Sequence, residues 1–138
     1  MTNMLLAGFG GQGVLFAGKI IAYAGLMEDK QVSWLPSYGP EMRGGTANCS
    51  VCLSDQPIGS PLVLNPELLI VMNLPSYDKF IGTVTPGGIA VIDSALIDKT
   101  CDRTDISCFY VPATTLASEQ NLEGLSNIIL LGKALAES

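Results

Sequence analysis

The sequence predicts one α/β domain over residues 1–138, built in three layers, with helices on both faces of a mostly parallel β-sheet. Several short segments are continuous apolar runs, which is typical of strands that are buried on both faces. Segments with a helical spacing of apolar residues alternate with these runs, as they do around parallel sheets. A chain of 138 residues, 48% of them apolar, is also long enough for one substantial core.

The first expected strand and helix lie close to the N-terminus. Residues 3–8, NMLLAG, form a short apolar run that ends at glycine, which predicts a buried strand. Residues 14–27 follow with helical spacing, which predicts a helix. The apolar positions at that spacing are Val14, Ala17, Ile21, Ala24 and Met27.

Five more strands and three helical segments are expected further along the chain. Turns rich in proline and glycine, at 54–60 and 85–88, separate some of them. The expected strands are residues 32–35, 46–53, 67–72, 89–92 and 107–111. The expected helical segments are residues 75–80, 113–118 and 125–136.

Charge and composition argue against several classes of function. The net charge is −6, and an acidic chain without a cluster of Lys and Arg is a poor nucleic-acid binder. The chain has no histidine, which is the commonest general base and metal ligand near neutral pH, so a self-contained hydrolase or zinc enzyme is disfavoured. Only 14% of residues are charged, which indicates a surface partly covered by other chains. A compact monomer with a large core is the alternative.

The sequence also predicts a location. No apolar run approaches the ~20 residues of a transmembrane helix. The N-terminus has neither a basic region nor a small-residue cleavage site, so no signal peptide is expected. We therefore expect a cytoplasmic protein that does not contact a membrane.

Four cysteines raise the question of a metal or iron–sulfur site. Cys49 and Cys52 form a C-x-x-C motif, which is a frequent ligand pattern. They fall on an expected strand, where residues three apart face opposite sides and cannot converge on one ion. The spacing of Cys101 and Cys108 fits no usual cluster pattern, so we expect free thiols and no metal site.

Three glycines join the first strand to the first helix. Gly8, Gly10 and Gly13 have G-x-G-x-x-G spacing between a strand and a helix, the Rossmann-like context of a phosphate-binding turn. A dinucleotide site also needs an acidic residue at the end of the second strand, where this chain has Trp34 and Leu35. NAD and FAD are therefore disfavoured. Anion binding and close packing of helix on strand both stay open for these glycines.

Residues 36–51, PSYGPEMRGGTANCSV, hold the most constrained loop of the chain. Two prolines stiffen it, Arg43 offers a rigid fork that suits phosphate or carboxylate, and Gly44 and Gly45 allow a close approach. If the first two strands are neighbours, this loop opens at the sheet edge where ligands bind. The alternative is a rigid surface turn with an exposed pair of Glu41 and Arg43.

These two motifs together carry a family resemblance. GFGGQGV at 8–14 and PSYGPEMRGGTANCSV at 36–51 closely resemble the gamma subunit of 2-oxoacid:acceptor (ferredoxin) oxidoreductases. The same domain is fused within single-chain pyruvate and indolepyruvate oxidoreductases. The resemblance extends to NIILLGKALAES at the end of the sequence. Members of the family continue with more helical sequence, so the resemblance implies that the C-terminal helical part is short in this sequence.

The resemblance implies a subunit rather than a whole enzyme. Complexes of this family convert a 2-oxoacid and coenzyme A to acyl-CoA and carbon dioxide, and pass electrons to ferredoxin or flavodoxin. Thiamine diphosphate and Mg²⁺ are then expected with the alpha and beta subunits, and iron–sulfur clusters in a beta or small delta subunit. The isolated chain is expected to be inactive and to hold no cofactor alone. 2-Oxoglutarate is the first expected substrate, followed by pyruvate and branched-chain or aromatic oxoacids.

The resemblance also implies which residues face coenzyme A or a partner subunit, and none of them is expected to be catalytic. They are Gly10, Gly11, Gln12, Gly13, Ser37, Tyr38, Arg43, Gly44 and Gly45. Two alternatives from other classes are a free-standing nucleotide-binding sensor module and a structural scaffold that contacts no ligand.

Overall fold

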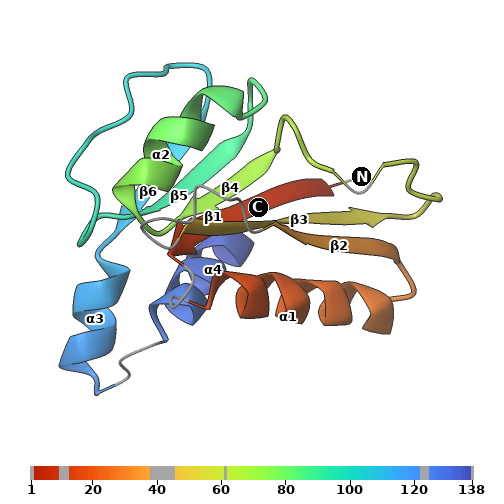
Figure 1. Ribbon diagram of the computed structural model, residues 1–138, viewed down its shortest axis with the longest axis horizontal. Helices are drawn as coiled ribbons and strands as arrows, with labels where there is room; N and C mark the ends of the chain where they lie inside the picture. Colours follow the sequence, from red (N-terminus) through yellow and green to blue (C-terminus); the bar gives the residue numbers. More distant parts are fainter. Residues whose placement is uncertain (1, 10–12, 38–45, 61, 122–124, 138) are drawn as a thin grey trace.

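The computed structural model describes residues 2–9, 13–37, 46–60, 62–121 and 125–137 (Figure 1). Every expected strand and helix is present within two residues of its expected bounds. The strands are β1 Thr2–Phe9, β2 Gln31–Ser37, β3 Thr46–Ser54, β4 Leu68–Val71, β5 Ile89–Asp93 and β6 Ser107–Val111. The helices are α1 Val14–Met27, α2 Leu74–Phe80, the 3-10 helix η2 Ile81–Thr83, α3 Ala113–Glu119 and α4 Ser126–Glu137.

The strands form one sheet in the order β2-β3-β1-β4-β5-β6. The pairs β1–β4, β4–β5 and β5–β6 are parallel, whereas β3 is antiparallel to both β1 and β2. β3 therefore runs against the other described strands, and the mostly parallel sheet is confirmed.

β1 and β2 are not neighbours in the sheet, because β3 lies between them. α1 carries the chain from β1 to β2, which leaves these two strands parallel. β3 then runs in the opposite direction and pairs with both β1 and β2, so it lies between them.

Helices cover both faces of the sheet, so the three layers are confirmed (Figure 1). α1 and α4 lie on one face, over a cluster that includes Leu6, Val51 and Ile70. α2 lies on the other face, over a cluster that includes Leu69 and Val71. Consecutive residues of β4 thus enter different clusters, which explains why its sequence is continuously apolar.

α1 approaches β2 and β3 closely because two of its inner positions are glycines. A Cβ atom at Gly18 would lie 2.4 Å from Sγ of Cys49, and one at Gly25 would lie 2.6 Å from Cδ2 of Leu53. Close helix–strand packing therefore rests on Gly18 and Gly25 within the helix, which the glycine motif does not include.

The C-x-x-C cysteines face opposite sides of β3. Cys49 belongs to the cluster under α1, and its thiol donates to the carbonyl oxygen of Val14 at 3.7 Å. Cys52 is three residues further along the strand, so its side chain points to the other face, where it is also buried. Burial raises the pKa of the Cys49 thiol to about 12. Over the described residues, we find no helix that is long and apolar enough to cross a membrane.

Candidate functional site

Both predicted loops leave the sheet at the same edge. β1 and β2 run in the same direction, so their carboxyl ends lie together on either side of the start of β3. In the pairing register, Phe9 is opposite Thr46 and Ser37 is opposite Asn48. Ligands of doubly wound sheets bind at the carboxyl ends of the strands, so we take this edge as the candidate site.

Most of the predicted site residues lie outside the described residues. This applies to Gly10, Gly11, Gln12, Tyr38, Arg43, Gly44 and Gly45. Gly13 and the backbone of Ser37 are described, one at the start of α1 and one at the end of β2. The structure thus brings together the points from which the two loops depart.

Gly13 begins α1 in a left-handed conformation, with φ 74° and ψ 24°. Its carbonyl oxygen accepts the N–H of Ala17 at 3.0 Å, which starts the helix, and also Nδ2 of Asn127 at 3.0 Å. A Cβ atom at this position would lie 2.6 Å from that same Nδ2. Glycine is therefore needed here both for its backbone conformation and for the contact with Asn127.

Asn127, near the start of α4, is a site residue that sequence reasoning missed. It is only 3% exposed, and its bond to Gly13 ties the first turn of α4 to the first turn of α1. Its Oδ1 is buried without a hydrogen-bond partner. The one signal in the sequence is a single amide within the apolar run SNIILLGKALA.

A second buried amide lies beside the end of β1, in the turn that follows β4. Asn73 follows β4, is 1% exposed, and caps α2 by accepting the N–H of Ser76 at 2.9 Å. The N–H of the preceding residue, Met72, donates a hydrogen bond to the carbonyl oxygen of Ala7, which places this turn beside the end of β1. Nδ2 of Asn73 is buried without a partner. Asparagine followed by Leu74-Pro75 is a helix-start signal that could have identified it.

Asp93 lies at the same edge of the sheet, at the end of β5. It is fully buried, and its carboxylate accepts Oγ1 of Thr114 at 2.6 Å and the N–H of Ala95 at 3.0 Å. The N–H of Thr114 lies 3.4 Å from the carboxylate, so Asp93 caps α3 from the adjacent strand. These contacts give Asp93 a structural role.

The edge offers groups that bind rather than groups that react. The bond between Gly13 and Asn127 joins the starts of α1 and α4, so the positive ends of two helix dipoles lie together. Buried amides with unused polar atoms lie on each side. This arrangement suits an anionic ligand or the polar backbone of a partner chain.

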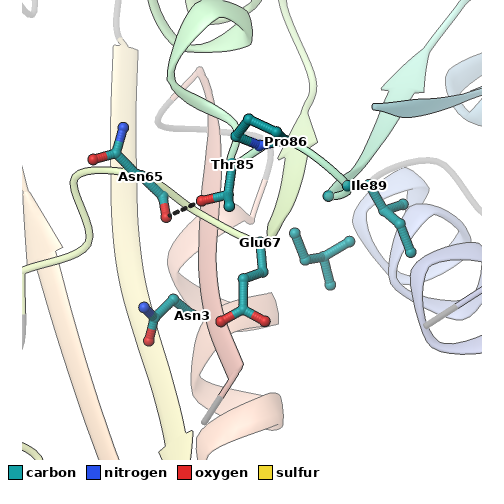
Figure 2. Close-up of a pocket in the computed structure, with 9 residues that line it drawn as sticks. Asn3, Asn65, Glu67, Thr85, Pro86 and Ile89 are labelled. Atoms are coloured by element: carbon teal, nitrogen blue, oxygen red, sulfur yellow. Dashed lines mark hydrogen bonds between the residues drawn. The ribbon is translucent and has the colours of Figure 1, made fainter. Parts of the chain in front are cut away.

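A pocket at the opposite edge is separate from this site. It has a volume of 470 Å³ and lies where β1, β4 and β5 begin (Figure 2). Oγ1 of Thr85 donates to the carbonyl oxygen of Asn65 at 3.0 Å on one wall, while Asn3 and Glu67 line another part. Among the described residues, Gly13, Asn73 and Asn127 do not line it.

Curated relatives resemble the chain over almost its whole length. It is 42% identical to ketoisovalerate oxidoreductase subunit VorA of Methanothermobacter marburgensis, over 98% of this chain and 28% of that protein. It is 38% identical to 2-oxoglutarate synthase subunit KorC of Methanocaldococcus jannaschii, over 92% of this chain and 70% of that protein. The chain thus spans less than a third of VorA and about two thirds of KorC.

Solved structures share the fold. The gamma subunit of a keto/oxoacid ferredoxin oxidoreductase from Geobacter sulfurreducens matches with a TM-score of 0.81 and 28% identity, over 96% of this chain and 74% of that chain. A 2-oxoglutarate:ferredoxin oxidoreductase from Magnetococcus marinus matches with a TM-score of 0.83 and 22% identity, over 95% of this chain and 23% of that chain. The second likeness concerns the fold alone.

The family model described as pyruvate ferredoxin/flavodoxin oxidoreductase matches residues 3–138. That span contains both sequence motifs, all the described helices and nearly the whole sheet. The chain therefore belongs to the pyruvate ferredoxin/flavodoxin oxidoreductase family.

Proposed function

We propose that the chain is the gamma subunit of a cytoplasmic 2-oxoacid:ferredoxin oxidoreductase. It works with alpha and beta subunits, and with a delta subunit in some complexes. These partners hold thiamine diphosphate, Mg²⁺ and iron–sulfur clusters, and the complex passes electrons to ferredoxin or flavodoxin. The observation that carries the proposal is the family match over residues 3–138, together with small subunits such as KorC among the relatives. These relatives also count against a free-standing nucleotide sensor.

Within the complex, the chain shapes the approach of coenzyme A and the contact with partner subunits. Two helix starts and the departure points of both loops at one sheet edge support this role. Arg43 supplies the fork for a phosphate or carboxylate, and Gly44 and Gly45 allow the close approach. Coenzyme A is the ligand to test first, because the Magnetococcus marinus enzyme of the same fold was solved with it bound.

The substrate of the complex is a 2-oxoacid, and we propose 2-oxoglutarate first. Four of the relatives are 2-oxoglutarate synthase subunits named KorC, and the chain covers 52–75% of their lengths. Ketoisovalerate is the next candidate, because the relatives with 40–42% identity are VorA subunits. Pyruvate follows. Turnover of these three acids by the purified complex will separate the candidates.

The substitution Arg43→Ala tests the role in coenzyme A approach. We expect the reconstituted complex to assemble. Its KM for coenzyme A should rise at least about tenfold, because the substitution removes one charge-assisted hydrogen bond. Lys99→Ala is the matched control, because it removes one positive charge from an exposed ion pair with Asp78. An unchanged KM in an assembled Arg43→Ala complex would exclude Arg43 from the coenzyme A path. Loss of assembly would assign it to a subunit interface.

A further inference from the structure

We propose that Cys101 and Cys108 form a redox-active dithiol, a modification site in which a two-electron oxidant converts the two thiols to a disulfide. The site lies on the α2 face of the sheet, along β6, away from both loops of the proposed coenzyme A path. It goes beyond the proposed function, because it does not depend on the substrate of the complex.

The side chain of Cys108 points toward the α2 face. Along β6, Phe109 lies under Nζ of Lys133 from α4, and Val111 packs on the α1–α4 cluster. The alternation of a strand then directs Cys108 and Tyr110 to the other face, and Cys108 packs on the α2 cluster.

The connection between β5 and β6 brings Cys101 back over this same face. The backbone N–H of Cys101 donates to the hydroxyl oxygen of Tyr110 at 2.8 Å. Burial and the Cys101 side chain together raise the pKa of the Cys108 thiol and of the Tyr77 hydroxyl, which places Cys101 close to both. Cys101 thus lies beside Tyr110, which is the next residue after Cys108 on the same face of β6, and this proximity is the geometric basis of the proposal.

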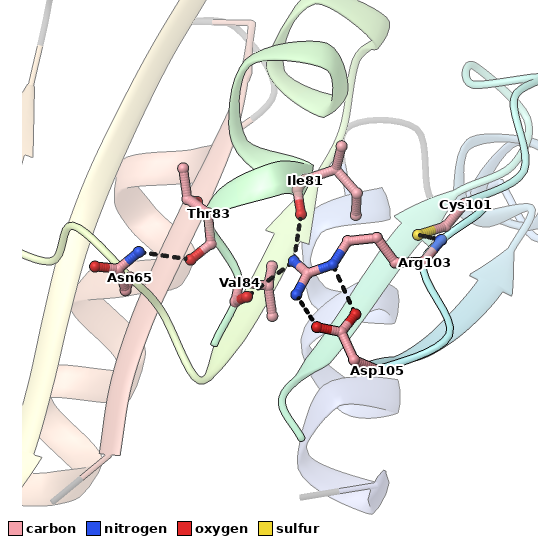
Figure 3. Close-up of polar contacts among 7 residues, drawn as sticks. All are labelled: Asn65, Ile81, Thr83, Val84, Cys101, Arg103 and Asp105. Carbon is pink, nitrogen blue, oxygen red and sulfur yellow. Dashed lines mark hydrogen bonds and ion pairs between the residues drawn. The ribbon is translucent and has the colours of Figure 1, made fainter. Parts of the chain in front are cut away.

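An arginine holds this connection in place (Figure 3). Arg103 forms a bidentate pair with Asp105, with Nε to Oδ1 at 2.9 Å and Nη2 to Oδ2 at 2.7 Å. Its Nη1 donates to the carbonyl oxygens of Ile81 at 3.0 Å and Val84 at 2.8 Å, which anchors the connection to the end of α2 and η2. The backbone N–H of Arg103 donates to Sγ of Cys101 at 3.4 Å. The contacts of Arg103 therefore hold the Cys101 sulfur in place on this side of the sheet.

The other two cysteines provide an internal contrast. Cys49 and Cys52 are 0% and 2% exposed and point to opposite faces of β3, so they can neither meet nor be reached from solvent. Cys101 and Cys108 are both half-buried, and so are within reach of a small oxidant.

The chemistry balances with hydrogen peroxide as the oxidant. The Cys101 sulfur attacks one oxygen of the peroxide, so an S–O bond forms as the O–O bond breaks. The product is a sulfenic acid, and the leaving hydroxide departs as water with the thiol proton. The Cys108 sulfur then attacks the sulfenic sulfur, the S–S bond forms, and a second water leaves. Two thiol hydrogens and two electrons have passed to the peroxide. Burial raises the pKa of the Cys108 thiol to about 12, which disfavours Cys108 as the first nucleophile, so we assign the first attack to Cys101.

Trypsin cleaves after Lys99 and after Arg103, which makes the proposed link easy to detect. Each cysteine then lies on its own peptide, Cys101 within residues 100–103 and Cys108 within residues 104–133. The full chain is treated with dilute hydrogen peroxide, quenched in acid, alkylated under denaturing conditions and digested. We expect most of the chain to give these two peptides joined, two hydrogens lighter than their sum, and separable by dithiothreitol.

Two variants serve as controls. Cys101→Ser removes the joined peptides and leaves Cys108 open to alkylation, whereas Cys52→Ala leaves the joined peptides at their wild-type yield. Recovery of both peptides separately after peroxide treatment of the wild-type chain, whether alkylated or singly oxidised, would overturn the proposal. Equal linkage of Cys101 to Cys49 or Cys52 would also overturn it, because it would show disulfide exchange in unfolded chain.

Discussion

Gly13 holds a left-handed backbone conformation while it lies against the amide of Asn127, and both facts exclude a side chain at this position. The conformation lets the chain turn from β1 into α1, and the contact links that turn to α4. The left-handed backbone of Gly13 thus joins the starts of α1 and α4 at this edge of the sheet.

We expect Gly13→Ala to lower the free energy of unfolding by about 1–3 kcal/mol, because alanine disfavours the left-handed region and its Cβ would displace Asn127. Urea denaturation measures the change. Gly132→Ala is the matched control, since a Cβ there would meet open space on α4. It should leave stability unchanged or raise it by up to about 1 kcal/mol. Equal stability of Gly13→Ala and the wild type would contradict this account.

Cys49 makes stability depend on alkaline pH. Burial raises the pKa of its thiol from 9.0 to about 12, so the folded chain keeps a proton that the unfolded chain releases. This stabilisation is complete below pH 9.0 and is lost as the pH rises from there toward about 12, at up to about 1.4 kcal/mol per pH unit. Cys49→Ala should therefore show a shallower loss of stability across that range in denaturation curves. A slope identical to that of the wild type would show that the thiol does not contribute.

At the scale of elements, α1 and β3 are held together by close approach rather than by large side chains. Gly18 leaves room for the sulfur of Cys49, and Gly25 leaves room for Leu53. The helix can therefore pack closely against β2 and β3.

Gly18→Ala tests this packing. Its Cβ would lie 2.4 Å from Sγ of Cys49, so we expect a loss of about 1–3 kcal/mol in the free energy of unfolding. Cys49→Ala removes that sulfur, so the double variant should be more stable than the sum of the two single changes predicts. Additive effects in this double-mutant cycle would mean that the two residues do not share the contact.

The elements could be predicted from the sequence because buried strands and amphipathic helices have local patterns. ELLIVM and residues 14–27 predict β4 and α1 without knowledge of their neighbours. The entry of β3 between β1 and β2 could not be predicted, since strand order is decided by packing between distant segments. Asn127 was missed as a site residue for the same reason, because a single amide in an apolar run has no pattern until its partner is known. Asn73 was missed although Leu74-Pro75 after it marks a helix start.

The outer surface of α1 carries exposed apolar side chains, as expected for a sequence with few charged residues. Phe16, Tyr23 and Leu26 are 58%, 58% and 56% exposed, and Met27 is 86% exposed. Apolar side chains gathered on one helix are typical of a surface that contacts another chain. The proposed place in a complex gives this surface a role that a monomer does not.

Purification of the tagged chain from its native host under anaerobic conditions tests the central claim most directly. We predict that larger subunits co-purify, that the eluate contains thiamine diphosphate, and that it shows the broad visible absorbance of iron–sulfur clusters. The purified complex should then oxidise a 2-oxoacid only when coenzyme A and an electron acceptor are present. A chain that elutes alone, colourless and without thiamine diphosphate under gentle conditions would contradict the proposed function.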